Sequence, residues 1–183
     1  MSNTREIIES DKFKSTNKIW NDKKFNAISN VGPMMQIVKG CHNLGEFTSE
    51  YYKCYRGLER LESTAEAFRR ACLAEGIELT SEEAYKYAWI RVVYQTWEGY
   101  SRELRVMEQL REYTDLIIEP ATYEEDVKYA IDAKAYRAGK LMFGIQIKPK
   151  SYKNCYTSSH MINFKKNQLF KNDYKRDVIY IYA

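Results

Sequence analysis

The stretch ATYEEDVKYAIDAKAYRAGKLMFGIQIKPKSY, residues 121–152, decides the fold of this 183-residue chain. Two runs rich in apolar and aromatic residues, 127–136 and 140–152, predict two strands. The Arg-Ala-Gly connection between them is short and contains the glycine that a tight hairpin favours. A capping box, Thr122-Tyr-Glu-Glu125, opens a short turn of helix before the hairpin.

Two polar side chains stand among apolar positions of the second predicted strand. Because side chains alternate across a strand, Gln146 and Lys148 share one face, whereas the two isoleucines of the GIQIK sequence share the other. Asp132 is expected at the end of the preceding strand, where the hairpin can bring its carboxylate beside them. A carboxylate, an amide oxygen and a lysine around one point form a hard-cation site of the kind that Mg²⁺ prefers.

Outside the hairpin, the N-terminal side of the chain is predicted to be helical. Apolar residues spaced at three and four predict an amphipathic helix over residues 48–75, which Gly76 ends. A Thr-Ser-Glu-Glu capping box at residues 80–83 begins a second long helix that runs to about Tyr113, with a bend near Gly99. The first 45 or so residues are turn-prone and predict a short helix or two with loops.

The C-terminal side predicts one more helix within residues 151–177 and a last strand at 178–183. The expected class is α+β or α/β, in one globular unit with an N-terminal helical part, residues 1–79, and a core, residues 80–183. The N-terminus has no apolar signal block, and no window is long and apolar enough for a membrane span, so a cytoplasmic protein is expected. The four cysteines form no CxxC pair and are expected to be free thiols.

Basic residues are concentrated in one segment. Residues 134–176 carry a net charge of +10, against −5 for residues 1–133, so the segment is suited to a polyanion such as nucleic acid, although a solvated lysine-rich surface is the alternative. Tentative DNA contacts are Lys150, Tyr152, Lys153, Asn154, Lys165 and Lys166. The chain has only two histidines, no phosphate-binding glycine loop and no dinucleotide fingerprint, which argues against histidine-based catalysis and nucleotide-dependent enzymes.

The order of Asp132, Gln146 and Lys148 resembles the PD-(D/E)xK nuclease superfamily, whose core places an Asp on one strand and a (D/E)xK triplet on the next. Within that superfamily the arrangement is similar to type II restriction endonucleases, and GIQIKPKSY, residues 144–152, resembles the MjaI-type restriction enzymes. The resemblance covers residues 96–152 well and the C-terminal strand loosely. It implies a central mixed sheet flanked by helices, with a mainly helical N-terminal part.

The resemblance also implies an activity, the Mg²⁺-dependent, sequence-specific hydrolysis of phosphodiester bonds in double-stranded DNA. Asp132 and Gln146 would hold the metal and Lys148 would act beside the attacking water. Gln146 stands where the family motif has Asp or Glu. In many members an acid from the preceding helix completes the metal shell, for which Glu103 is the first choice here and Glu98 the second. A homodimer and a cognate DNA methyltransferase in the same system are the implied partners.

Each candidate also has a structural alternative. Asp132 could accept backbone N–H bonds at a strand end, and Lys148 could be a lysine exposed on an edge strand. Glu125 and Asp126 are more typical of helix caps than of metal ligands, and the two glutamates of the preceding helix could pair with neighbouring arginines. Two other functions stay open: a repair or junction nuclease of the same superfamily, and a DNA-binding protein without catalysis in which Gln146 marks a decayed site.

Overall fold

A computed structural model describes residues 11–25, 31–154 and 158–183. The chain divides into two compact units, Met1–Gly99 and Tyr100–Ala183, which are described separately below. The sequence-based division between residues 79 and 80 lies earlier in the chain and stays a prediction. Among the described residues, no helix has both the length and the apolar character that crossing a membrane requires.

The first unit is helical in its described part and is built around aromatic side chains. Its elements are α2 (Asp11–Asp22), α4 (Val31–Lys39), α5 (Leu44–Lys53), the 3₁₀ turn η1 (Cys54–Arg56), α6 (Gly57–Ala74), α7 (Ser81–Trp89) and the π-helical η2 (Ile90–Tyr94), followed by the start of α8 (Gln95–Tyr113). The fully buried rings of Trp20 and Phe68 meet edge to face with centroids 5.1 Å apart, and Phe68 stacks on Tyr87 at 4.5 Å. Aromatic pairs of this kind add to the stabilisation that burial of their area provides.

The helix expected over residues 48–75 is two helices, so this prediction was wrong at its centre. Helix α5 ends at Lys53 and α6 begins at Gly57. Arg56 has a φ of 57°, in the left-handed region that a helix interior excludes. A Cβ added to Gly57 would lie 1.9 Å from the carbonyl oxygen of Tyr51, so the close approach of the two backbones permits only glycine.

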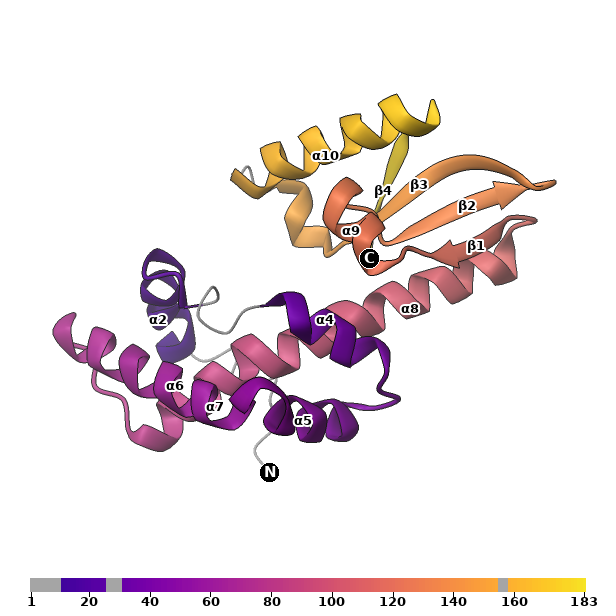
Figure 1. Ribbon diagram of the computed structural model, residues 1–183. Coiled ribbons are helices and arrows are strands. Elements are labelled where there is room, and N and C mark those ends of the chain that lie inside the picture. Colours follow the sequence, from indigo (N-terminus) through magenta and orange to yellow (C-terminus); the bar gives the residue numbers. More distant parts are fainter. Residues whose placement is uncertain (1–10, 26–30, 155–157) are drawn as a thin grey trace. The chain divides into compact units, whose positions relative to one another are not determined.

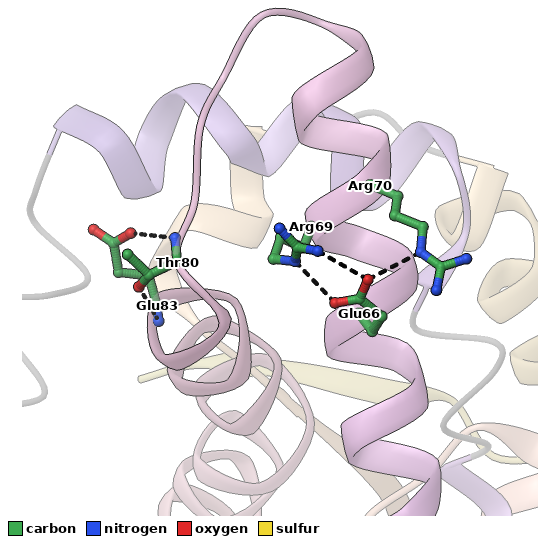
Figure 2. A network of polar contacts seen from close by, with 5 residues as sticks. All are labelled: Glu66, Arg69, Arg70, Thr80 and Glu83. Carbon is green, nitrogen blue, oxygen red and sulfur yellow. Dashed lines mark hydrogen bonds and ion pairs between the residues drawn. The ribbon is translucent and has the colours of Figure 1, made fainter.

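Figure 2 shows two networks of polar contacts in the first unit, of which the first confirms a predicted capping box. The Thr80 hydroxyl accepts a hydrogen bond from the Glu83 backbone N–H at 3.1 Å, and the Glu83 carboxylate accepts one from the Thr80 N–H at 2.8 Å, which completes the predicted capping box. On α6 the Glu66 carboxylate binds two arginines one turn further on. Hydrogen bonds from them lower the pKa of Glu66 to about 2.

The second unit is an α+β fold, as expected from the sequence. Its sheet has the order β1-β2-β3-β4, with strands β1 (Ile117–Pro120), β2 (Ala133–Arg137), β3 (Lys140–Lys148) and β4 (Val178–Tyr182). The first two pairings are antiparallel and β3 pairs with β4 in parallel, so the sheet is mixed and β3 is an inner strand. Its helices are the remainder of α8, the short α9 (Tyr123–Tyr129), the 3₁₀ turn η3 (Lys150–Asn154) and α10 (Ser158–Tyr174).

Helices pack on both faces of this sheet (Figure 1). On one face, Val106 and Met107 of α8 contact the buried side chains of Ile145 and Ile147. On the other face, aromatic side chains of α9 and α10 form a second cluster around Phe170. Gln146 and Lys148 alternate with the isoleucines along β3 and therefore belong to the face that carries α9 and α10.

The start of the first hairpin strand differs from the prediction. Residues 127–129 belong to α9, and β2 begins only at Ala133, so Asp132 precedes the strand and does not end it. The capping box at Thr122 is confirmed and accounts for the difference, because it fixes the chain in a helix that continues until Ala130 adopts a φ of 54°. The last helix and the C-terminal strand are confirmed, whereas the short strand β1 was not anticipated.

Candidate active site

Asp132 is fixed between the end of α9 and the start of β2. Its backbone N–H donates to the carbonyl of Ile145 at 2.7 Å, and its own carbonyl accepts from the N–H of Ala121 at 2.9 Å. The carboxylate Oδ2 accepts a hydrogen bond of 2.5 Å from the N–H of Ile147. This bond is the structural role that the sequence left open for Asp132. A carboxylate has about four acceptor sites, so the role is compatible with a further ligand.

Gln146 is a buried polar residue without a satisfied oxygen. Its side chain is on the inner strand β3 and the residue is only 2% exposed. Its amide Oε1 is buried and has no hydrogen-bond partner among the described residues. Burying an amide oxygen without a partner costs about 1–3 kcal/mol, so packing alone does not account for this glutamine.

Lys148 follows on the same face, two residues further along β3. It is half-buried, and its ammonium group makes no hydrogen bond or ion pair with any residue that the structure describes. Because β3 lies between β2 and β4, the interpretation of Lys148 as a lysine on an edge strand does not apply. The ammonium group is therefore a positive charge held near Gln146 without a described counter-ion.

Tyr180 of β4 is the register partner of Gln146. Its hydroxyl donates a hydrogen bond of 2.7 Å to the side-chain oxygen of Asn167. Burial raises the pKa of Tyr180 to about 12, with smaller contributions in the same direction from Tyr152, Tyr182 and the carboxylate of Asp132. The phenol is thus a neutral group in the vicinity of Asp132 at ordinary pH.

Asn167 of α10 connects this helix to β4 and to the end of α9. This residue was not singled out from the sequence. It is buried in α10, and its Nδ2 donates to the carbonyls of Tyr129 at 2.9 Å and Ala130 at 3.3 Å, while its oxygen accepts from Tyr180. These bonds tie α10 and β4 to the turn that leads into Asp132. The only sequence signal for this role is an asparagine inside a helix, a position that its helix propensity disfavours.

Glu125 is a helix-cap residue, as the structural alternative for it proposed. Its carboxylate accepts from the Thr122 N–H in the capping box, and its other oxygen pairs with Lys134 at 2.7 Å. Burial alone would lower the pKa of Lys134, but hydrogen bonding and charge pairing with Glu125 outweigh it and the pKa is raised. Asp126 lies in the same first turn of α9.

The two candidate helix acids lie in α8. Glu103 is half-buried and belongs to the second unit, next to Leu104, which packs on the sheet face opposite to that of Gln146. Glu98 belongs to the first unit. No group of three or more His, Cys, Asp or Glu that could hold a metal occurs within the described parts of the chain. Metal ligation by Glu103 or Glu98 stays a prediction.

The tentative DNA contacts lie on η3 and α10. Lys150 and Lys153 of η3 and Lys165 of α10 are exposed, whereas Lys166 is half-buried. Tyr152 is held in place, because its ring stacks on His160 at 3.9 Å and its hydroxyl accepts from Asn163 at 3.1 Å. Asn154 ends η3.

The cysteines do not enlarge this site. Cys41, Cys54 and Cys72 are free thiols, as expected, and all three belong to the first unit. Burial raises the pKa of the Cys72 thiol to about 11, which keeps it protonated and unreactive. Cys155 lies outside the described residues.

The turn before β2 and the inner strand β3 thus provide a carboxylate, a buried amide oxygen and an ammonium group. The two oxygens can bind a hard cation, and the ammonium group can balance negative charge on a phosphate. The MjaI restriction endonuclease family matches residues 16–183. Searches of curated proteins and of solved structures gave no match. From the length of the family match, which takes in both units, we conclude that the chain belongs to the MjaI restriction endonuclease family.

Proposed function

We propose that the protein is a type II restriction endonuclease of the PD-(D/E)xK type that hydrolyses phosphodiester bonds of double-stranded DNA at a specific sequence, with Mg²⁺ as its cofactor. The observation that supports this best is the pairing of an unsatisfied, buried Gln146 oxygen with the unpaired Lys148 ammonium on one face of β3. The buried Gln146 oxygen is costly without a partner, and a metal would provide one, whereas the half-buried Lys148 ammonium would bind a phosphate.

Asp132 and Gln146 are the residues that would hold the Mg²⁺. The unsatisfied Gln146 oxygen fits a hard cation or a water bound to it, and the Asp132 carboxylate provides the negative charge. When bound, the metal supplies Lewis acidity at the scissile phosphate and favours ionisation of an attacking water. Glu103 is the further carboxylate that we expect to contribute, with Glu98 as the alternative.

The protein's own groups have separate tasks around that metal. The backbone N–H of Ile147 orients the Asp132 carboxylate through a 2.5 Å hydrogen bond. The Lys148 ammonium would bind the phosphate and stabilise the additional negative charge that develops when water attacks. Tyr180 is neutral below its raised pKa, so it adds no charge that would repel a phosphate.

Sequence-specific cutting of both DNA strands is expected to require two copies of the protein. We expect a homodimer, because a two-fold protein can place two identical sites on a palindromic DNA sequence. The exposed lysines of η3 and α10, Lys150, Lys153 and Lys165, would contact phosphates, with Tyr152, Asn154 and Lys166 nearby in the chain. A cognate methyltransferase would be required to protect the host DNA.

The test is incubation of the purified protein with phage or plasmid DNA of known sequence, with Mg²⁺ and separately with EDTA. Discrete Mg²⁺-dependent fragments are expected, and the same fragments should be absent with Asp132→Asn. Unspecific degradation or cutting confined to branched DNA would favour a repair or junction nuclease instead. Intact DNA with slowed migration at low salt would contradict catalysis and leave a DNA-binding protein.

A further inference from the structure

A groove of about 590 Å³ runs along the second unit between α8 and the C-terminal end of β4. The α8 residues that line the groove have no role in the proposed metal binding or phosphodiester hydrolysis. The side chains that matter here are Arg102, Arg105, Gln109 and Tyr113 of α8, Lys150 of η3 and Tyr182 of β4. Of the described residues that line this groove, none has an acidic side chain.

The α8 side chains form one stripe along the helix. Residues 102, 105, 109 and 113 are spaced by three, four and four positions, which places them on one side of an α-helix. Eleven residues of helix span about 16 Å at 1.5 Å per residue. One strand of a DNA duplex advances about 3.4 Å per nucleotide along the axis, so the stripe matches the backbone of about five nucleotides.

The three cations of the groove are not neutralised within the described structure. Arg102, Arg105 and Lys150 take part in no salt bridge or side-chain hydrogen bond with any residue that the structure describes. Other charged side chains of this unit are paired, such as Lys134 with Glu125 and Arg137 with Asp115. Unpaired cations in a groove without acidic side chains create a positive potential that attracts a polyanion.

The groove reaches the C-terminal ends of β3 and β4, and its α8 wall packs on the sheet face opposite to that of Gln146 and Lys148. Tyr182, which lines it, is the register partner of Lys148, and Lys150 lies two residues beyond Lys148. We propose that this groove binds the DNA phosphate backbone, with Arg102 and Arg105 as phosphate contacts. The proposal rests on the proposed function, since the substrate is the same duplex, and it adds α8 to the DNA-binding surface.

The test is the salt dependence of binding of a fluorescent random-sequence DNA duplex in EDTA, which prevents cleavage. Each lost phosphate contact lowers the slope of log K against log salt by about 0.9. The double variant Arg102→Gln, Arg105→Gln loses two phosphate contacts, so its slope should be lower by about 1.8. When salt increases from 50 to 200 mM, the fold-decrease in its association constant should therefore be about 12 times smaller than that of the unchanged protein. Glutamine has nearly the same helix propensity as arginine, so α8 should be preserved, and circular dichroism will verify this.

Two control variants separate the groove from total charge. The pair Lys18→Gln and Lys23→Gln removes two exposed lysines of the first unit, and its slope should equal that of the unchanged protein. The pair Arg102→Lys and Arg105→Lys keeps both charges in the groove and should restore the slope. An equal reduction in the Lys18 and Lys23 variant, or no reduction in the groove variant, would overturn the proposal.

Cleavage is measured in parallel with Mg²⁺, which distinguishes the two proposals. If the unchanged protein and the groove variant show the expected difference in slope but the unchanged protein never cleaves DNA, the groove proposal is supported and the proposed catalysis is wrong. If it cleaves DNA and the groove variant cleaves equally well at every salt concentration with an unchanged slope, the groove proposal fails alone. Absence of any DNA binding by the unchanged protein would overturn the groove proposal as well.

Discussion

The carboxylate of Asp132 accepts a 2.5 Å hydrogen bond from the backbone N–H of Ile147, the residue between Gln146 and Lys148. The bond joins the turn after α9 to the C-terminal end of β3. It places the carboxylate beside the residue that separates the two candidate side chains. Position and charge at Asp132 can therefore be separated by mutation.

Asp132→Asn should retain the fold and abolish most of the cleavage. The amide oxygen can still accept the Ile147 hydrogen bond, but the negative charge that would hold Mg²⁺ is lost. We expect cleavage to fall by more than about 100-fold, with DNA binding in EDTA nearly unchanged. Fragment formation on a gel and a binding titration measure the two effects, and near-normal cleavage would show that another carboxylate holds the metal.

Lys148→Ala should reduce cleavage by about 10²–10³-fold, because a preorganised positive charge near the reacting phosphate is lost. Lys148→Arg should recover part of that loss. Lys140→Ala is the matched control, since Lys140 lies at the exposed start of the same strand. Single-turnover cleavage rates compare the three variants, and an equal effect of Lys140→Ala would contradict a local role for Lys148.

Substitutions of Gln146 should have opposite effects on stability and activity. Gln146→Met removes the buried, unsatisfied oxygen at similar volume, so the free energy of unfolding should increase by about 1 kcal/mol while cleavage is lost. Urea denaturation and cleavage assays measure the pair of effects. A destabilised Gln146→Met protein would indicate that the oxygen has a partner in solution.

Gln146→Glu should retain or increase cleavage, because it restores the second carboxylate of the family motif. Burial and the nearby Asp132 raise the pKa of a carboxyl group at this position, so the cleavage rate of the variant should increase with pH more steeply than that of the unchanged protein. A pH profile of single-turnover cleavage measures this. Complete loss of activity at every pH would mean that a neutral ligand is required.

Tyr180 should make stability depend on pH under alkaline conditions. Its pKa is about 12 in the folded protein and near 10 in an unfolded chain, so the folded state favours the protonated phenol. The stabilisation is complete below pH 10 and is lost as pH increases from 10 to 12. Urea denaturation between pH 9 and 11 should therefore show a smaller loss of stability for Tyr180→Phe than for the unchanged protein, and parallel curves would contradict this assignment.

Several local features of both units could be predicted from the sequence. Capping boxes at Thr80 and Thr122 are confirmed, because a cap depends on only four neighbouring residues. The alternation that places Gln146 and Lys148 on one face is also local. The start of β2 was predicted too early, because the pattern of residues 127–131 suits either a strand or the end of a short helix, and the cap decided between them.

The contacts that shape the site depend on pairing that local sequence does not specify. The proximity of Tyr180 to Gln146 follows from the parallel register of β4 on β3, across more than 30 residues of chain. The bonds of Asn167 to the carbonyls before Asp132 likewise depend on how α10 lies on the sheet. The broken helix at Arg56 has a similar cause, since Gly57 meets the backbone of Tyr51 there.

Gly144 sets how close α10 lies to the sheet. A Cβ at this position would be 3.1 Å from both the Ile131 side chain and the Phe170 ring, a tighter contact than side chains normally make. Across the family, the sizes of the residues at positions 144 and 170 should therefore vary together: a member that has alanine in place of glycine should carry a smaller side chain opposite it. Such paired changes would show that selection acts on the distance between β3 and α10, and not on either residue alone.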